Sequence, residues 1–167
     1  MYLYYALRMN ILVLCTGNSA RSILLEAILN NLSNGRLKAY SAGSNPTGIV
    51  NKYSISLLKK KGIENSSFSK SWLTFSNNSE IRMDIVITVC GNARDEECPY
   101  WPGNPLRTHW GVYDPADVSG TDLEKEKAFR DVYNILNNRA KAFLNLNFEN
   151  MSLKEIQKNL NKISEIE

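Results

Sequence analysis

The sequence predicts a doubly wound α/β fold in a single domain. Two apolar runs, residues 11–14 and 83–90, are continuous rather than alternating, which is typical of strands buried on both faces of a parallel sheet. Segments with apolar residues at helical spacing separate these runs from two further strand-like stretches. Strands that alternate with helices along a chain favour a parallel sheet with helices packed on it.

The expected elements follow from local signals along the chain. In order, they cover residues 11–14 (strand), 22–32 (helix), 37–43 (strand), 49–61 (helix), 83–90 (strand), 108–112 (strand) and 121–146 (helix). Gly62 follows the second helix, and glycine is a common C-terminal stop. Thr121 and Glu124 have capping-box spacing at the start of the long helix. The segment between the last two strands contains three prolines and is predicted to be irregular.

Both ends of the chain carry a separate expectation within a single catalytic domain, residues 1–167. Residues 1–8 are read as a loose extension or as a misassigned start. Residues 150–167 are predicted to form an amphipathic helix docked on the body, with a partner site as the less favoured alternative. The apolar stripe of that tail consists of Leu153, Ile156, Leu160 and Ile163.

Composition excludes several classes of protein. With 43% hydrophobic and 22% charged residues, the chain is expected to fold around one core of ordinary size. A net charge of +3, with no basic cluster interleaved with aromatic residues, argues against a nucleic-acid partner. No apolar run approaches the ~18 residues of a membrane span, and the N-terminus lacks the pattern of a signal peptide. We therefore expect a cytoplasmic monomer, in which the three cysteines are reduced and more often catalytic than structural.

A cysteine and an arginine stand six residues apart where the first strand ends. In open parallel sheets, ligands bind beyond the carboxyl ends of the strands, and Cys15 lies at such an end. The small residues that follow allow the backbone to aim N–H groups inward, next to the positive end of the next helix. The planar fork of Arg21 suits a tetrahedral oxyanion. The predicted oxyanion-binding loop comprises Thr16, Gly17, Asn18, Ser19, Ala20, Arg21 and Ser22.

The same positive field is expected to favour the thiolate form of Cys15, which would make it a nucleophile near neutral pH. Ser22 is expected to donate a hydrogen bond to that thiolate, and Asn18 is expected to brace the loop. The alternative is a buried cysteine with an unrelated arginine. It is disfavoured because strand end, glycine, cysteine, arginine and helix start all fall in register.

The Cys-x5-Arg-Ser loop after a first strand resembles the low-molecular-weight protein tyrosine phosphatase superfamily. The stretches YSAGSNP, SKSW, DIVITVC, CPYWPG and HWGVYDPA are similar to the arsenate reductase branch of that superfamily. The resemblance covers roughly residues 9–146. It implies a four-stranded parallel sheet flanked by helices on both faces. It also implies reduction of arsenate to arsenite, with no tightly bound cofactor and with an external thiol reductant.

Asp114 is the expected general acid. The resemblance places it over the bound anion, where it would help the leaving oxygen depart, and Pro115 stiffens its loop. The alternative is that the Asp-Pro pair makes an ordinary turn. Phosphatases of this superfamily usually have tyrosine after this pair, whereas Ala116 follows here, which favours a reductase.

A second thiol distinguishes a reductase from a phosphatase. A phosphatase hydrolyses its cysteinyl intermediate with water, whereas arsenate reduction needs another thiol to attack Cys15. Cys90 ends the third strand, which neighbours the first in this fold at ~4.8 Å, a separation that a disulfide can bridge. Cys98, eight residues on, is expected to capture Cys90 in turn. The alternative for Cys90 is simple burial, as is common for free cysteines.

The expected partners are arsenate, with phosphate and sulfate as analogues, and glutaredoxin or thioredoxin. The spacing of Cys90 and Cys98 resembles that of members served by glutathione and glutaredoxin. Cys90, Cys98 and His109 fit no standard zinc pattern, and only part of a potassium site known in relatives is matched, so no metal is predicted. The alternatives to a reductase are a tyrosine or small-molecule phosphatase and an oxyanion-binding or redox-sensing module.

Overall fold

We describe the protein from a computed structural model that covers residues 8–78, 80–95 and 99–167. Its centre is a four-stranded parallel sheet in the order β2-β1-β3-β4, which confirms the predicted fold class. The strands are β1 (Met9–Cys15), β2 (Leu37–Gly43), β3 (Ile85–Thr88) and β4 (Leu106–His109). Because β1 pairs with both β2 and β3, the strand that ends at Cys15 lies in the middle of the sheet and beside the strand that leads to Cys90.

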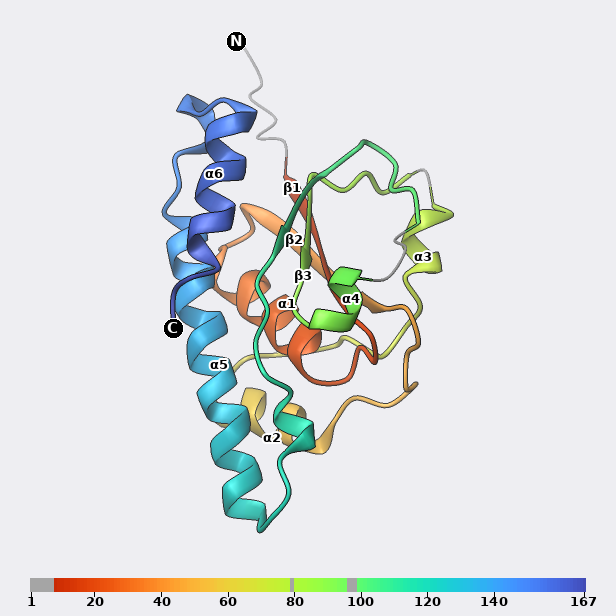
Figure 1. Cartoon of the computed structure of the whole chain (residues 1–167), viewed down its shortest axis with the longest axis vertical. Coiled ribbons are helices and arrows are strands. Elements are labelled where there is room, and N and C mark those ends of the chain that lie inside the picture. Colours follow the sequence, from red (N-terminus) through yellow and green to blue (C-terminus); the bar gives the residue numbers. More distant parts are fainter. Residues whose placement is uncertain (1–7, 79, 96–98) are drawn as a thin grey trace.

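Six α-helices are assigned in the described residues, together with two 3-10 turns. The helices are α1 (Arg21–Leu32), α2 (Lys52–Lys60), α3 (Leu73–Ser76), α4 (Gly91–Asp95), α5 (Asp122–Leu144) and α6 (Leu153–Ile163), and the turns are Pro115–Asp117 and Phe148–Asn150. The long helix α5 runs along one side of the molecule, with α2 beside its N-terminal half and α6 beside its C-terminal half (Figure 1). None of these helices is both long and apolar enough to cross a lipid bilayer.

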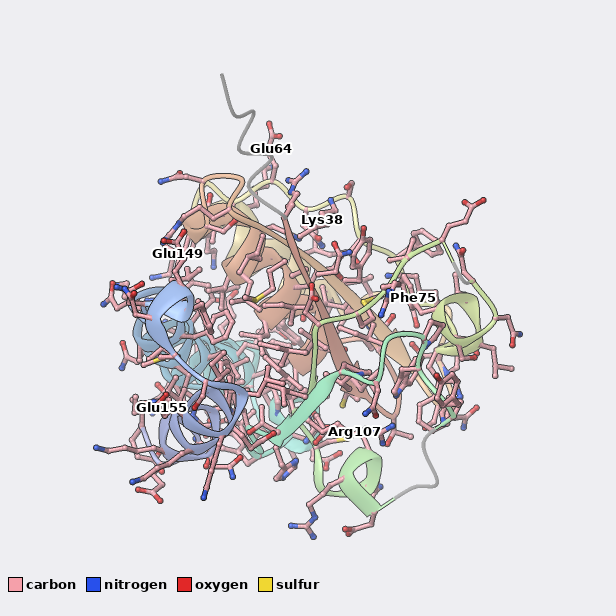
Figure 2. All side chains as sticks on the ribbon, turned by 90° about the horizontal axis from the view of Figure 1, so that it is seen from above. Lys38, Glu64, Phe75, Arg107, Glu149 and Glu155 are labelled. Carbon is pink, nitrogen blue, oxygen red and sulfur yellow. The ribbon has the colours of Figure 1, made fainter. Side chains whose placement is uncertain are left out.

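The two faces of β1 contribute to separate apolar clusters, because successive side chains of a strand point to opposite faces. Ile11 and Val13 belong to the larger cluster, which includes buried residues of α1, α2, α5 and α6. Leu12 and Leu14 pack on the other face with residues such as Trp101. Seen from above, Glu149 and Glu155 lie on the side of α5 and α6, and α3 lies on the opposite side (Figure 2).

Several predicted boundaries were wrong. The second helix begins at Lys52 rather than at residue 49, because the Asn51 side chain accepts the Tyr53 N–H and caps the helix there. The third strand ends at Thr88, so Cys90 lies beyond it, at the start of the unpredicted helix α4. The fourth strand ends at His109, short of residue 112.

The helix caps near the C-terminus agree with the sequence pattern. Thr121 and Glu124 form the predicted capping box of α5. A second capping box, formed by Ser152 and Glu155, begins α6. The apolar stripe of the tail is buried at Ile156, and likewise at positions 160 and 163, whereas Leu153 is exposed.

Candidate active site

Backbone carbonyls of the loop between β1 and α1 accept hydrogen bonds from the segment that follows β2. The acceptors Thr16, Gly17 and Ser19 bind backbone N–H groups of Asn45, Thr47 and Asn51, each at 3.0 Å. Among the described residues, the backbone N–H groups at positions 17–20 donate to no protein acceptor. A run of free N–H groups at a helix N-terminus is suited to hold an oxyanion. The loop is therefore suited to the oxyanion-binding role that the sequence predicts.

Asn18 braces this loop from a left-handed backbone conformation, with φ at 44°, and its side chain is fully buried. Its Nδ2 donates to the hydroxyls of Ser22 and Ser41, both at 2.9 Å. Its Oδ1 accepts the backbone N–H of Lys70 at 2.9 Å. Asn18 therefore joins three separate segments behind the loop, and the Ser22 hydroxyl serves it as an acceptor.

A polar network behind Asn18 includes Glu26 and Ser41, which the family resemblance matches to part of a potassium site. The carboxylate of Glu26 accepts the hydroxyls of Ser41 and Ser67. Lys70 Nζ donates to Ser67 Oγ at 3.2 Å and to the Phe68 carbonyl at 2.9 Å. Burial lowers the pKa of Lys70, and the charge of Glu26 acts against that shift. No short-range sequence signal connects these residues, because they come from α1, β2 and an irregular segment.

Arg21 is bound by the segment that carries Asp114. We call residues 110–114 the acid loop. Arg21 Nη1 donates to the Val112 carbonyl at 3.1 Å, and Nη2 pairs with Asp114 Oδ2 at 2.6 Å. The predicted anion ligand and the predicted general acid thus meet, as an ion pair with side chains 13% and 29% exposed. An incoming oxyanion has to compete with Asp114 for this guanidinium.

Cys90 lies against the first residue of the oxyanion-binding loop. Its Sγ accepts the backbone N–H groups of Thr16 and Ala93, both at 3.4 Å, and lies 3.5 Å from the Thr16 hydroxyl. Cys15 and Cys90 are both free and buried, and each thiol shifts the pKa of the other. The two sulfurs therefore share one site, although Cys90 lies beyond the end of β3. Cys98 lies outside the described residues.

Groups around its sulfur lower the pKa of Cys90, while the Cys15 thiolate expected from the sequence stays a prediction. The neighbouring Cys15 thiol, with the hydrogen-bond donors of Thr16 and Ala93, lowers the pKa of Cys90 to about 5. Cys90 in turn raises the pKa of Cys15, and burial adds to the shift. Arg21 acts in the opposite direction, but its charge is offset by Asp114. The sequence could not reveal this, because it depends on which sulfur receives the amide donors.

His109 lies at the end of β4, close to the second thiol. Its Nδ1 is 2.8 Å from the hydroxyl of Thr88, at the end of β3. Burial lowers the pKa of His109, as does the charge of Arg94, while Cys90 raises it. The ring also packs against Gly111, where an added Cβ would lie 2.4 Å from Nε2. His109 therefore contributes to the packing around Cys90 and the acid loop.

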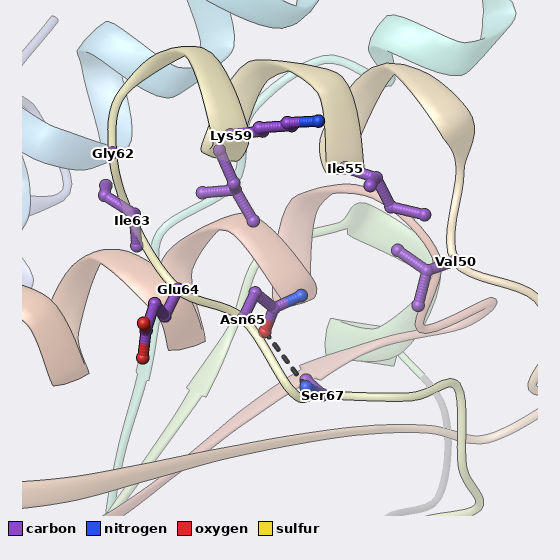
Figure 3. A pocket seen from close by; sticks show the side chains of 9 residues that line it. Val50, Ile55, Lys59, Gly62, Ile63, Glu64, Asn65 and Ser67 are labelled. Atoms are coloured by element: carbon purple, nitrogen blue, oxygen red, sulfur yellow. Dashed lines mark hydrogen bonds between the residues drawn. The ribbon is translucent and has the colours of Figure 1, made fainter.

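A cavity of about 480 Å³ lies between α2 and the segment that follows it (Figure 3). Side chains of Val50, Ile55 and Ile63 face it, and Asn65 bonds the backbone N–H of Ser67 at 3.1 Å along its wall. None of its lining residues belongs to the oxyanion-binding loop or the acid loop. The candidate active site is therefore the loop of backbone N–H groups itself, not this cavity.

Comparisons with known proteins agree with this geometry. Residues 10–162 match the family model described as low molecular weight phosphotyrosine protein phosphatase. The chain is 38% identical over 130 residues to an arsenate reductase of Halalkalibacterium halodurans, which covers 78% of this chain and 91% of that protein. It is 37% identical over 132 residues to an arsenate reductase of Bacillus subtilis, and this match also covers 78% of this chain and 91% of that protein.

A solved structure is similar as well. The crystal structure of an arsenate reductase from Archaeoglobus fulgidus is 25% identical in sequence, with a TM-score of 0.63, and the match covers 81% of this chain and 99% of that chain. The chain therefore belongs to the low molecular weight phosphotyrosine protein phosphatase family and groups within it, by sequence, with arsenate reductases.

Proposed function

We propose that this protein reduces arsenate to arsenite, with Cys15 as the nucleophile and Cys90 as the thiol that releases the product. The observation that carries the proposal is the position of Cys90 Sγ, 3.4 Å from the backbone nitrogen of Thr16, the residue that follows Cys15. Hydrolysis of a phosphocysteine needs water and has no use for a second sulfur at this point. Reduction needs one there.

Binding begins with an exchange of partners at Arg21. Arsenate binds the free N–H groups of the loop and replaces Asp114 as the partner of the Arg21 guanidinium. A planar guanidinium binds two oxygens of a tetrahedral anion better than one carboxylate oxygen and one carbonyl. The released Asp114 stays close, because its loop is held beside the site, and it becomes available for proton transfer.

The first chemical step joins sulfur to arsenic. Cys15 Sγ attacks the arsenic, and an As–O bond breaks as water leaves. The released Asp114 carboxylate takes the Cys15 thiol proton and passes it to the departing oxygen, which leaves as water. The resulting arseno-cysteine still contains As(V), so no electrons have yet been transferred to arsenic.

The second step is the reduction. The Cys90 thiolate attacks Cys15 Sγ, a disulfide forms, and the S–As bond breaks with its electron pair going to arsenic. Arsenite leaves after taking protons from solvent, so two thiol electrons have reduced As(V) to As(III). The low pKa of Cys90 suits this role, because an attacking thiol must be deprotonated.

An external thiol reductant must then restore the two cysteines. Cys98 is proposed to attack Cys90 and present the disulfide to that reductant, and glutaredoxin with glutathione is favoured over thioredoxin. A cytoplasmic location fits the need for reduced thiols. No resident metal or organic cofactor is part of this reaction.

The test follows the fate of the three thiols. Reduced protein is treated with arsenate in the absence of other reductants, and its peptides are analysed by mass spectrometry. We expect a Cys15–Cys90 disulfide in stoichiometric yield with arsenite, and its accumulation in Cys98→Ser. Cys90→Ser should stop multiple turnover while leaving hydrolysis of a small aryl phosphate unaffected. Free thiols after arsenate treatment, together with brisk aryl phosphate hydrolysis, would establish a phosphatase instead.

A further inference from the structure

Hydrogen bonds connect the C-terminal helix to the acid loop through one buried arginine. Arg139, in the C-terminal half of α5, is 3% exposed. Its Nη1 donates to the carbonyls of Trp110 and Gly111 at 2.9 and 3.2 Å, and its Nε donates to the Ile166 carbonyl at 2.8 Å. Trp110 in turn donates from Nε1 to the Leu160 carbonyl of α6 at 3.0 Å. The start of the acid loop is therefore held by α5 and α6 together, and the two helices lie side by side in Figure 1.

The other end of the same loop binds Arg21. The Val112 carbonyl accepts Arg21 Nη1, and Asp114 pairs with Nη2. The Gly111 carbonyl, which Arg139 holds, and the Val112 carbonyl, which Arg21 holds, belong to consecutive residues. Their two rigid peptide units are joined at the Val112 Cα, so a displacement of one carbonyl limits the positions that the other can take. The position of Arg139 is thereby transmitted to the guanidinium that receives the oxyanion.

Stability alone does not account for this arginine. No carboxylate of the described residues lies within ion-pair distance of its guanidinium, and main-chain carbonyls are its acceptors. Desolvation of an arginine is costly, and well-packed apolar residues at such sites are often equally or more stabilising. What an apolar residue cannot supply is a fork that fixes three carbonyls from two separate segments. The arrangement therefore favours a positional role.

We propose that Arg139, held in place by the end of α6, is a positioning residue that fixes the acid loop relative to Arg21. It sets the rate of Cys15 attack and does not provide affinity for the oxyanion. The inference rests on the proposed function only through the reaction that is used to measure it. Displacement of reacting groups by about 1 Å can cost ~100-fold in rate, so loss of this positioning should have a measurable effect.

The experiment compares Arg139→Gln and Arg139→Lys with Arg36→Gln in the full chain. Arg36 also bonds α5, through the Leu144 carbonyl at 3.2 Å, but it makes no contact with the acid loop. We expect Arg139→Gln to lower the single-turnover rate of Cys15 modification by saturating arsenate about 10- to 100-fold. Arg139→Lys should recover part of that loss, and Arg36→Gln should match the wild-type rate.

Sulfate affinity separates positioning from general damage. It is measured by titration calorimetry, and in Arg139→Gln we expect it to be unchanged or higher. A folded Arg139→Gln with a wild-type rate, or with affinity and rate lost in proportion, overturns the inference. If this variant has no cooperative unfolding transition, deletion of residues 165–167 decides. That deletion removes the Ile166 carbonyl and should slow the reaction about three- to tenfold, whereas an unchanged rate overturns the inference.

A wild-type protein that does not react with arsenate would end the proposed function without deciding this inference. The same variants are then compared in hydrolysis of p-nitrophenyl phosphate, where the acid loop serves the same leaving oxygen. A slowed release of nitrophenol in Arg139→Gln, with Arg36→Gln unaffected, supports the positioning role. Equal rates in both variants reject it.

Discussion

Replacing Asp114 by asparagine should move anion affinity and reaction rate in opposite directions. In the anion-free protein, Asp114 occupies one half of the Arg21 fork at 2.6 Å. The Asp114→Asn variant keeps the size of the side chain and removes its charge. Arg21 then has no carboxylate to give up when an oxyanion enters, so binding becomes tighter, while proton transfer to the leaving oxygen is lost.

The magnitude follows from the exposure of the pair. Two unit charges 4 Å apart attract by about 4 kcal/mol at an effective dielectric constant of about 20, but measured pairs that contact solvent retain about 1 kcal/mol. The Arg21–Asp114 pair is partly buried, with the two side chains 13% and 29% exposed. We therefore assign about 1–2 kcal/mol to it. Removing that competition should raise sulfate affinity about 5- to 30-fold, whereas loss of a general acid should lower the rate of Cys15 modification about 10²–10⁴-fold.

Two assays measure these effects separately. Sulfate affinity is obtained by titration calorimetry, and formation of the arseno-cysteine is followed by rapid quench and mass spectrometry. Asp117→Asn is the matched control, because it removes an exposed carboxylate from the same 3-10 turn. Equal or weaker sulfate binding in Asp114→Asn would refute the exchange of partners at Arg21. An equal gain in Asp117→Asn would show that net charge alone is responsible.

Three further changes test other parts of the site. In Gly43→Ala, the new Cβ would lie 2.3 Å from the Thr16 carbonyl oxygen, so the oxyanion-binding loop must shift and arsenate turnover should fall at least 100-fold. Gly35→Ala is the control: nothing lies within 4 Å of its Cβ, so the change should cost only backbone strain at its φ of 80°. The pKa of Cys90 is lowered from 9.0 to about 5. The stability that its thiolate contributes is therefore fully present only above pH 9 and declines as the pH falls towards 5. The temperature of thermal unfolding between pH 5.5 and 8.5 should accordingly depend more steeply on pH in the wild type than in Cys90→Ser. Arg21→Lys should lose most activity because lysine lacks the bidentate fork, and a wild-type KM for arsenate would contradict this.

Local patterns were sufficient to predict the fold and to propose the first half of the site. The apolar run of β1, the small residues after Cys15 and the start of α1 are contiguous, so their geometry follows from nearest neighbours in the sequence. Local patterns could not predict the contact between Arg21 and Asp114, since these residues are 93 positions apart. Only the family resemblance brought them together in advance, because periodicity carries no information about which loops converge.

The elements that the sequence missed depend on tertiary contacts. Helices α3 and α4 have four and five residues, too few for a periodic apolar pattern to be distinguished from an irregular segment. The role of Arg139 was equally hidden. From the helical pattern of the sequence alone, Arg139 would be predicted to be an exposed cation. Its burial becomes evident only in the folded chain, where three carbonyls from distant segments surround it.

The surroundings of the two thiols show why residue type alone does not determine chemical role. Cys15 has the motif, the helix N-terminus and the arginine, and from these features its pKa should be low. In the folded chain the arginine is neutralised by Asp114, and the nearest amide, that of Thr16, points at Cys90. The proposed relay makes two successive sulfur attacks, so it needs two thiols that are activated in different ways. Cys90 receives the amide donors of Thr16 and Ala93. We expect the entry of the oxyanion to separate Arg21 from Asp114 and thereby to favour the Cys15 thiolate.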